Sequence, residues 1–285
     1  YHNTSKVKRT SFILNKSTWT HGWRIRIEDV FLQGGLRMKD SILEVCADSV
    51  ESVLAAEKGG ADRIELCSNI VIGGTTPSES LFREIRKYSD IRIHALIRPR
   101  FGDFCYTEYE FNIIKDEVKR FRELGAQGVV IGMLKPDGTM DMEHMKALME
   151  ESGDMSVTLH RAFDVCKDWE EALEQSVSLG INTILTSGQH NNCVEGMDVL
   201  KELQKKSRGR IRIMAGAGIN AQAISVIHQE TGIQDYHMTG KILMDSEMKY
   251  RKEGVNMGLP CLSEFEIFRT DENEVRKARN VIDKF

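Results

Sequence analysis

The chain alternates strand-like and helix-like segments eight times, and this alternation limits the possible folds more than any other feature. Strands are predicted at 42–46, 62–66, 91–97, 128–132, 155–160, 181–186, 211–215 and 234–239. Strands that alternate with helices through short connections form a parallel sheet, and eight such units close into a (β/α)8 barrel. A doubly wound open sheet is the alternative, but no dinucleotide-binding fingerprint follows the first strand. We therefore predict an α/β protein with a TIM-type barrel.

Several expected helices are marked by capping residues at their starts. Capping-box patterns, with Ser, Thr or Asp three positions before Glu, occur at 48–51, 76–79, 107–110 and 168–171. Pro77 is expected at the first helical position of the second of these helices, and Asn220 is a candidate cap for a later one. The segment 241–270 has weak periodicity and is predicted to be an extended loop. Residues 272–284 are predicted to form the last helix.

The start of the chain differs in charge from the rest. Residues 1–40 carry eight basic and three acidic side chains, a net charge of +5, which leaves −9 for the remainder of a chain whose total is −4. We expect 1–40 to be a flexible extension, either disordered or artificially added, with a targeting leader as the alternative. We find no domain boundary within 41–285, so we predict a single barrel domain there.

Composition narrows the partners and the location. An acidic body argues against nucleic acid as the main partner, and the lack of a long apolar run argues against a membrane protein. The six cysteines are scattered and form no CxxC pair. In a chain of this length such spacing indicates reduced thiols. We expect the protein in the cytoplasm and, as a further option, in the nucleus.

The side chains expected inside the barrel include charged ones. Alternate residues of a strand face opposite sides, and we expect the apolar set to face the helices. The residues left facing inward are Glu44, Cys46, Glu65, Cys67, Arg92, His94, Leu96, Arg98, Thr158, His160, Arg212 and Met214. Burial of unpaired charge is costly, so these groups must pair with one another or meet a ligand. Barrel active sites lie at the carboxyl ends of the strands, where Arg98, His160 and Asp164 are expected. For Glu44 and Arg212 a buried scaffold network is the simpler interpretation.

The first two strands end in the same pattern, which reads apolar, Glu, apolar, Cys at 43–46 and again at 64–67. Parallel strands lie about 4.8 Å apart, so neighbouring strands would bring the thiols of Cys46 and Cys67 together. A thiolate–zinc bond is roughly 2.3 Å, so two bonds of this kind nearly span the gap. Two thiolates alone suit a soft ion of low coordination number such as Cu(I). Buried packing of two small residues and a disulfide remain alternatives.

A glycine-rich loop follows the seventh expected strand. In Ala215-Gly216-Ala217-Gly218-Ile219-Asn220 the loop opens a helix, and exposed backbone N–H groups there would form an anion site. Barrels often bind phosphate in the loops after strands seven and eight. The alternative is a tight turn that needs Gly216 and Gly218 for their backbone conformation.

The motifs taken together resemble a known family. The runs LEVCADSVESVLAAEKGGADRIELC, GGTTPS, IRPRFGDFCY, HRAFD, ILTSGQ and AGAGI, in this order, resemble the CutC copper homeostasis family. The resemblance covers about 41–285 and implies a TIM-type barrel, a cytosolic copper-handling role and assembly into homo-oligomers. It places at the barrel mouth Glu44, Cys46, Glu65, Cys67, Arg98, Arg100, His160, Arg161 and Asp164. Near the eighth strand the family tends towards His followed by Ser, and this chain has His237 and Thr239, so neither is assigned to the site.

Two functional hypotheses follow. In the first, the protein binds Cu(I) through Cys46 and Cys67 and serves copper homeostasis. In the second, the barrel is an isomerase, lyase or hydrolase acting on a small anionic or phosphorylated metabolite. For this enzyme the candidate catalytic residues are Glu44, Glu65, Arg98, His160 and Asp164. His160 or a carboxylate would move the proton. Arg98 and Arg100 would hold the anion, together with the Gly216–Gly218 loop.

Overall fold

The computed structural model describes residues 41–258 and 262–285. The predicted extension 1–40 and Cys261 lie outside the described residues. Eight parallel strands form a closed barrel in chain order. They are β1 Ile42–Ala47, β2 Arg63–Leu66, β3 Arg92–Leu96, β4 Gly128–Ile131, β5 Ser156–Leu159, β6 Thr183–Thr186, β7 Arg212–Gly216 and β8 Asp235–Met238. The first strand pairs with both the second and the eighth, which closes the sheet and confirms the predicted (β/α)8 fold.

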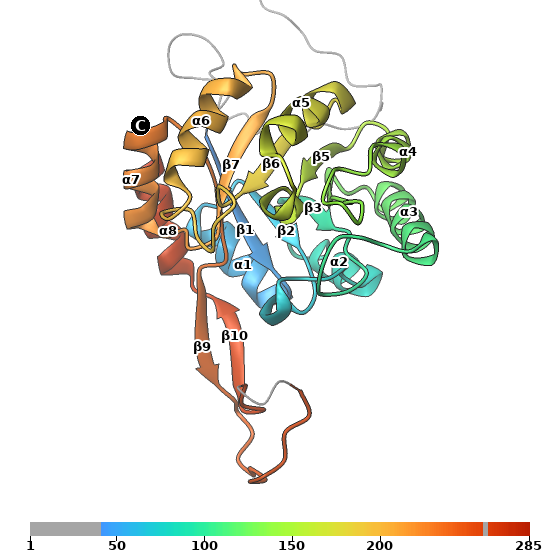
Figure 1. Ribbon diagram of the computed structural model, residues 1–285. Coiled ribbons are helices and arrows are strands. Elements are labelled where there is room, and N and C mark those ends of the chain that lie inside the picture. Colours follow the sequence, from blue (N-terminus) through green and yellow to red (C-terminus); the bar gives the residue numbers. More distant parts are fainter. Residues whose placement is uncertain (1–40, 259–261) are drawn as a thin grey trace, which may run out of the picture. The chain divides into compact units, whose positions relative to one another are not determined.

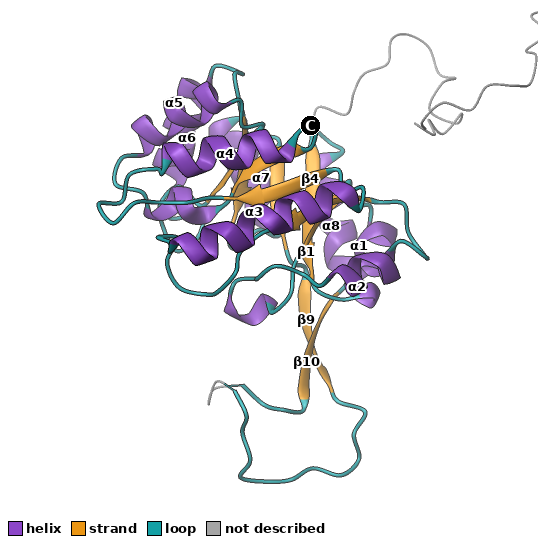
Figure 2. Ribbon diagram, turned by 90° about the vertical axis from the view of Figure 1, so that its right-hand side faces the viewer, coloured by secondary structure: helices purple, strands orange, loops and turns teal. Residues whose placement is uncertain are grey.

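Eight helices accompany the strands in the part of the chain that the structure describes (Figures 1 and 2). They are α1 Val50–Gly59, α2 Glu79–Ile85, α3 Glu108–Glu123, α4 Met142–Ser152, α5 Trp169–Leu179, α6 Met197–Ser207, α7 Ala221–Thr231 and α8 Glu272–Ile282. Short 3-10 helices, η2 Ile70–Ile72 and η3 Arg161–Val165, follow β2 and β5. None of the described helices combines the length and the apolar character that a membrane crossing requires.

Capping explains where the helices begin. Thr107 and Glu110 form the full reciprocal capping box at α3, and Asp168 and Asn220 accept backbone N–H bonds at the starts of α5 and α7. Two details of the prediction are wrong. The cap of α1 is Ser49, which accepts from the N–H of Ser52, and not Asp48. The cap of α2 is Ser78, which accepts from the N–H of Leu81, so Pro77 precedes the helix and does not occupy its first position.

The sheet separates two sets of side chains. Alternate strand residues such as Val45, Ile64 and Ile93 are fully buried between the sheet and the helices, in the main apolar core. The opposite set lines the barrel interior, where Cys46, Cys67, Leu96 and Val130 form a small separate cluster. Arg92 and Arg212, which were also predicted to face inward, begin β3 and β7 and are exposed.

The prediction of an extended loop over 241–270 is wrong at both ends of that segment, which are strands. Residues Lys241–Asp245 (β9) and Glu266–Thr270 (β10) pair antiparallel and form a two-stranded ribbon. Both views show this ribbon extending away from the barrel (Figures 1 and 2). Its base is anchored where the Thr270 N–H donates to the Ser52 hydroxyl of α1, and the chain then enters α8, the helix predicted at 272–284.

Candidate functional site

A cavity of about 450 Å³ opens at the carboxyl end of the barrel. Its polar lining comes from β1, β2, β8 and the segments that follow β3 and β5. Its apolar lining consists of Ile70, Ile72, Leu96, Phe104, Val165 and Leu185. A concave and mainly apolar cavity with a few converging polar groups is the usual form of a small-ligand site.

The two thiols meet inside the barrel, beside this cavity. Cys46 lies near the end of β1, Cys67 directly follows β2, and both side chains are buried. Their Sγ atoms are 3.4 Å apart, and both are free thiols. The hydrogen bond with Cys67, burial and the nearby Glu65 carboxyl raise the pKa of the Cys46 thiol well above its usual value. A metal ion bound here must therefore displace a firmly held proton.

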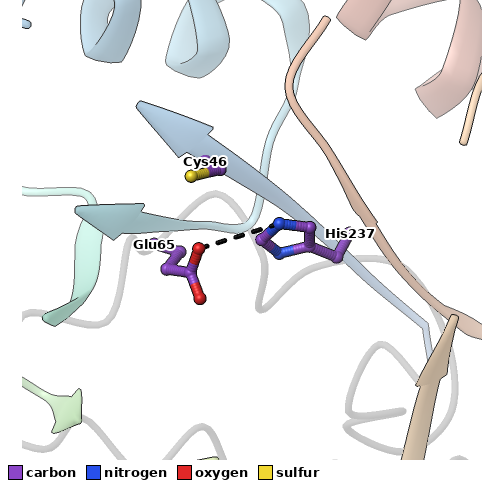
Figure 3. A group of neighbouring side chains, drawn as sticks. All are labelled: Cys46, Glu65 and His237. Carbon is purple, nitrogen blue, oxygen red and sulfur yellow. Dashed lines mark ion pairs between the residues drawn. The ribbon is translucent and has the colours of Figure 1, made fainter. Parts of the chain in front are cut away.

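His237 and Glu65 complete a compact donor group with Cys46 (Figure 3). One ligand atom from each of the three residues lies within 4.8 Å of the others. The His237 Nε2 atom is 3.7 Å from a Glu65 carboxylate oxygen. Burial raises the pKa of Glu65, with a further contribution from Glu44. Burial would lower the pKa of His237, but Glu65, Cys46 and Glu44 together raise it well above its usual value.

Glu44 lies deeper in the barrel and positions His237 within this donor group. Its carboxylate is fully buried, accepts from Arg63 Nε, and is 2.7 Å from His237 Nδ1. Burial alone would raise the pKa of Glu44, but Arg63 and His237 reverse the effect and lower it. With both carboxylate oxygens occupied, Glu44 fixes the ring of His237 and leaves Nε2 toward Glu65 and the cavity. An outer carboxylate of this kind commonly orients a ligating histidine.

His237 is the site residue that the sequence analysis left out. The signal was present, because His237 alternates with the fully buried Tyr236 and is the register partner of Glu44. The alternation rule that places residues of strands one, two, three, five and seven inward also turns His237 inward when it is applied to the eighth strand.

The donor set suits a metal ion. Two sulfur atoms 3.4 Å apart fit a soft ion such as Cu(I). Together with the nitrogen of His237 and an oxygen of Glu65 they also match the ligand types of zinc. Cys46 and Cys67 would hold the ion, and His237 is placed to add a third bond once it has lost the proton on Nε2.

On another wall of the cavity lie Arg98 and His160, both buried. His160 Nδ1 accepts from the N–H of Ala162, which leaves the proton of the neutral ring on Nε2. Burial and the charge of Arg98 lower the pKa of His160 to about 3. Among the described residues Nε2 has no hydrogen-bond partner.

Asp164 lines the cavity but is heavily occupied. It accepts bonds from the side chains of Thr186 and Arg161, from the backbone and side chain of Ser187, and from the N–H of Gln189. A carboxylate with this many donors has a fixed position and little capacity left to accept from a ligand. This arrangement favours a role in orienting Arg161 and the loop after β6 over proton transfer.

The other predicted anion-binding residues lie apart from the cavity lining. Arg100 pairs with Glu110 at 2.6 Å and with Asp103 at 3.0 Å. Gly216 ends β7, where a Cβ atom would come within 2.6 Å of Leu185. Gly218 has a φ of +78°, which L side chains rarely adopt. The geometry of this loop therefore agrees with the turn interpretation.

Comparison with known proteins places the chain in a family. A family model described as the CutC family matches residues 41–242. The chain belongs to the CutC family. A CutC family protein of Bacteroides thetaiotaomicron is 48% identical over 225 residues, which cover 78% of this chain and 89% of that protein. One from Pasteurella multocida is 41% identical over 243 residues and is covered to 99% of its length.

Solved structures give the same result. The CutC protein of Streptococcus agalactiae, which its name assigns provisionally to copper homeostasis, superposes with a TM-score of 0.67 at 32% identity. The match covers 70% of this chain and 98% of that one. A thiamine phosphate pyrophosphorylase from Pyrococcus furiosus has a TM-score of 0.51 at 15% identity and shares the fold alone.

Proposed function

We propose that this CutC family member binds Cu(I) through Cys46 and Cys67 and takes part in copper homeostasis. The observation that carries the proposal is the 3.4 Å separation of two buried sulfur atoms on adjacent strands. Two thiolates on one rigid sheet edge select a soft monovalent ion over Mg²⁺ or Ca²⁺, which prefer oxygen ligands. In this proposal copper is the ion that the protein binds and passes on, and not a permanently bound cofactor.

The surrounding residues support ion exchange at this position. The ion displaces the thiol protons, and the Glu65 carboxyl lies beside Cys46 to receive one. Glu44 and Arg63 keep these groups in place. Because the cavity reaches Cys46, a carrier or a small chelator has direct access to one of the two sulfur atoms.

A competition titration tests the proposal. Under anaerobic conditions a chromogenic Cu(I) chelator competes with wild-type protein and with the double variant Cys46→Ser, Cys67→Ser. We expect the double variant to bind Cu(I) at least about a hundredfold more weakly than wild type. Cys105→Ser, at a half-buried thiol away from the cavity, is the matched control and should bind like wild type. Equal affinity of the double variant and wild type would refute the thiol-pair site.

An enzymatic role is the second candidate, and the pairing of Glu65 with His237 favours it. A buried carboxyl with a raised pKa beside a histidine in a cavity is a common proton-transfer arrangement. Isomerase, lyase and hydrolase chemistry all need such a group. Incubation of a metabolite library in D₂O, followed by mass spectrometry, would reveal conversion or deuterium uptake that Glu65→Gln abolishes. Turnover that Glu65→Gln leaves intact, or no turnover of any compound, would count against it.

The setting proposed for either role is a homo-oligomer in the cytoplasm. The five cysteines that the structure describes are all free, which agrees with a reducing compartment. The ribbon of β9 and β10 exposes apolar side chains that a second subunit could cover.

A further inference from the structure

Arg98 is a buried cation with an unusual set of partners. Its side chain follows β3 and is only 8% exposed. The guanidinium donates to the carbonyl oxygens of Gly73, Gly74 and Gly102. No carboxylate pairs with it among the residues that the structure describes. Carbonyl dipoles orient the group and partly solvate it, but they do not neutralise its charge.

The backbone around Arg98 is shaped to supply these carbonyls. Gly73 and Gly74 have φ angles of +86° and +83°, which are strained for residues other than glycine. A Cβ on Gly74 would lie 2.7 Å from the side chain of Leu96. The chain therefore uses two adjacent glycines to wrap its carbonyl groups around one cation at the cavity wall.

His160 presents a hydrogen-bond donor to the same part of the cavity. It is 5% exposed, its tautomer is fixed by the N–H of Ala162, and the Nε2–H group has no partner among the described residues. Leaving a buried donor unpaired costs free energy. A donor that can only donate requires a ligand atom that accepts.

Phe104 brings the two groups together. The Arg98 guanidinium lies over the Phe104 ring at 5.0 Å, and the rings of Phe104 and His160 are 4.6 Å apart. All three residues line the cavity. The cation and the donor therefore border one apolar face, as a ligand with one charged acceptor group and an apolar body requires.

The charges around the cavity determine the sign and size of the charge that a ligand must carry. Arg161 pairs with Asp164 at 2.6 Å. The two carboxylates Glu44 and Glu65 are matched by two cations, because Arg63 pairs with Glu44 and His237 lies between Glu44 and Glu65. These groups compensate one another, whereas Arg98 has no carboxylate of its own. The excess is a single positive charge, and two buried donors at this wall, His160 Nε2 and Arg98 Nε, have no partner among the described residues.

We infer that the cavity binds a small organic monocarboxylate, whose carboxylate accepts from His160 Nε2 beside Arg98 and whose apolar part fills the space along Phe104 and Leu96. A phosphate fits less well, because a dianion needs more donors and the terminal nitrogen atoms of Arg98 already donate to carbonyls. The inference deepens the enzyme candidate by naming its substrate class, and it rests on that candidate only for turnover, because binding needs neither the thiols nor a reaction.

Ligand-detected NMR on protein freed of copper by a chelator tests the inference. The probes are a series of monocarboxylates from propanoate to 3-phenylpropanoate, the neutral amide of each, and inorganic phosphate. At least one carboxylate should bind saturably, and its amide should bind about thirtyfold more weakly. The inference is overturned if no acid binds, if amides bind as well as acids, or if phosphate displaces the acids. Because copper is absent, failure of the thiol pair to bind Cu(I) leaves this result unchanged.

Variants locate the bound carboxylate. Arg98→Met should weaken binding by at least about thirtyfold, while Arg120→Met, at an exposed position of α3, should bind like wild type. His160→Leu should also lose binding, and His160→Gln, which can donate from a similar position, should recover part of it. If Arg98→Met does not fold, the ring ¹⁵N signals of His160 in wild type provide the second measurement. A bound acid must shift the Nε2 resonance, and its insensitivity to saturating acid would refute the inference.

Discussion

His160 lies in the folded protein as a neutral ring beside a buried cation, and this makes it a point of acid sensitivity. Burial and Arg98 lower its pKa to about 3, whereas a histidine in an unfolded chain has a pKa of about 6.5. The unfolded state therefore binds a proton more readily than the folded state between these values. Stability from this residue is full above about pH 6.5 and is lost as the pH falls toward 3.

The first prediction concerns this loss. The free energy of unfolding should fall by up to about 1.4 kcal/mol per pH unit for this group as the pH drops from 6.5 toward 3. Urea denaturation at several pH values measures it. His160→Gln, which does not titrate, should show a shallower slope than wild type over the same range. Identical slopes would mean that His160 does not remain neutral in the folded protein.

At the scale of single residues, the sequence predicted a pair of neighbouring side chains better than a hydrogen-bond network of many residues. The positions of Cys46 and Cys67 follow from strand alternation and parallel pairing, and the structure brings their sulfur atoms into contact. Strand alternation also turns His237 inward, although the chain departs from the family's usual residues near the eighth strand. The saturation of Asp164 by the loop after β6 depends on a turn whose shape no local pattern specifies.

Individual elements owe their limits to a few capping residues. At α3 the Thr107 hydroxyl accepts from the N–H of Glu110, whose carboxylate accepts from the N–H of Thr107 in return. This satisfies two backbone donors that the helix itself leaves unpaired. The box also fixes Glu110 where it pairs with Arg100, so it orders the loop between β3 and α3 that carries Phe104.

The second prediction follows from this cap. Thr107→Ala should lower the free energy of unfolding by about 1 kcal/mol, because the first turn of α3 loses its side-chain acceptor. Ser225→Ala, at an exposed position within α7, is the control and should change stability by less than about 0.5 kcal/mol. Chemical denaturation of the two variants beside wild type makes the comparison. Equal effects would show that the box contributes nothing specific.

The barrel strands, each of which buries one face against the helices, were predicted well. The ribbon of β9 and β10, which buries neither face, was missed. Strands of the barrel have an apolar face against the helices and so show a period of two. In β9 the residues Ile242, Leu243 and Met244 are consecutive and are between 40% and 51% exposed. Apolar and polar residues do not alternate in β9, so the sequence of a ribbon that packs on no core resembles that of a loop.

For the whole molecule, closure of the barrel followed from counting strands, but the arm formed by β9 and β10 did not. A two-stranded ribbon is marginally stable by itself in water. Residues Ile242, Met244 and Ile267 share one face of this ribbon, because Met244 and Ile267 are paired and Ile242 is two positions away. All three are at least 39% exposed. A contiguous apolar face on an extended arm is typical of an assembly contact.

The third prediction is that the protein is a homo-oligomer and that this face holds it together. Wild type should sediment as more than one chain in analytical ultracentrifugation. The double variant Ile242→Lys, Met244→Lys should sediment as a smaller species, because it places charge on the buried face of the contact while the barrel keeps its own core. Val226→Lys, at an exposed position of α7, controls for added charge and should assemble like wild type. A monomeric wild type would contradict the assembly, and a double variant that still assembles would place the contact elsewhere on the barrel.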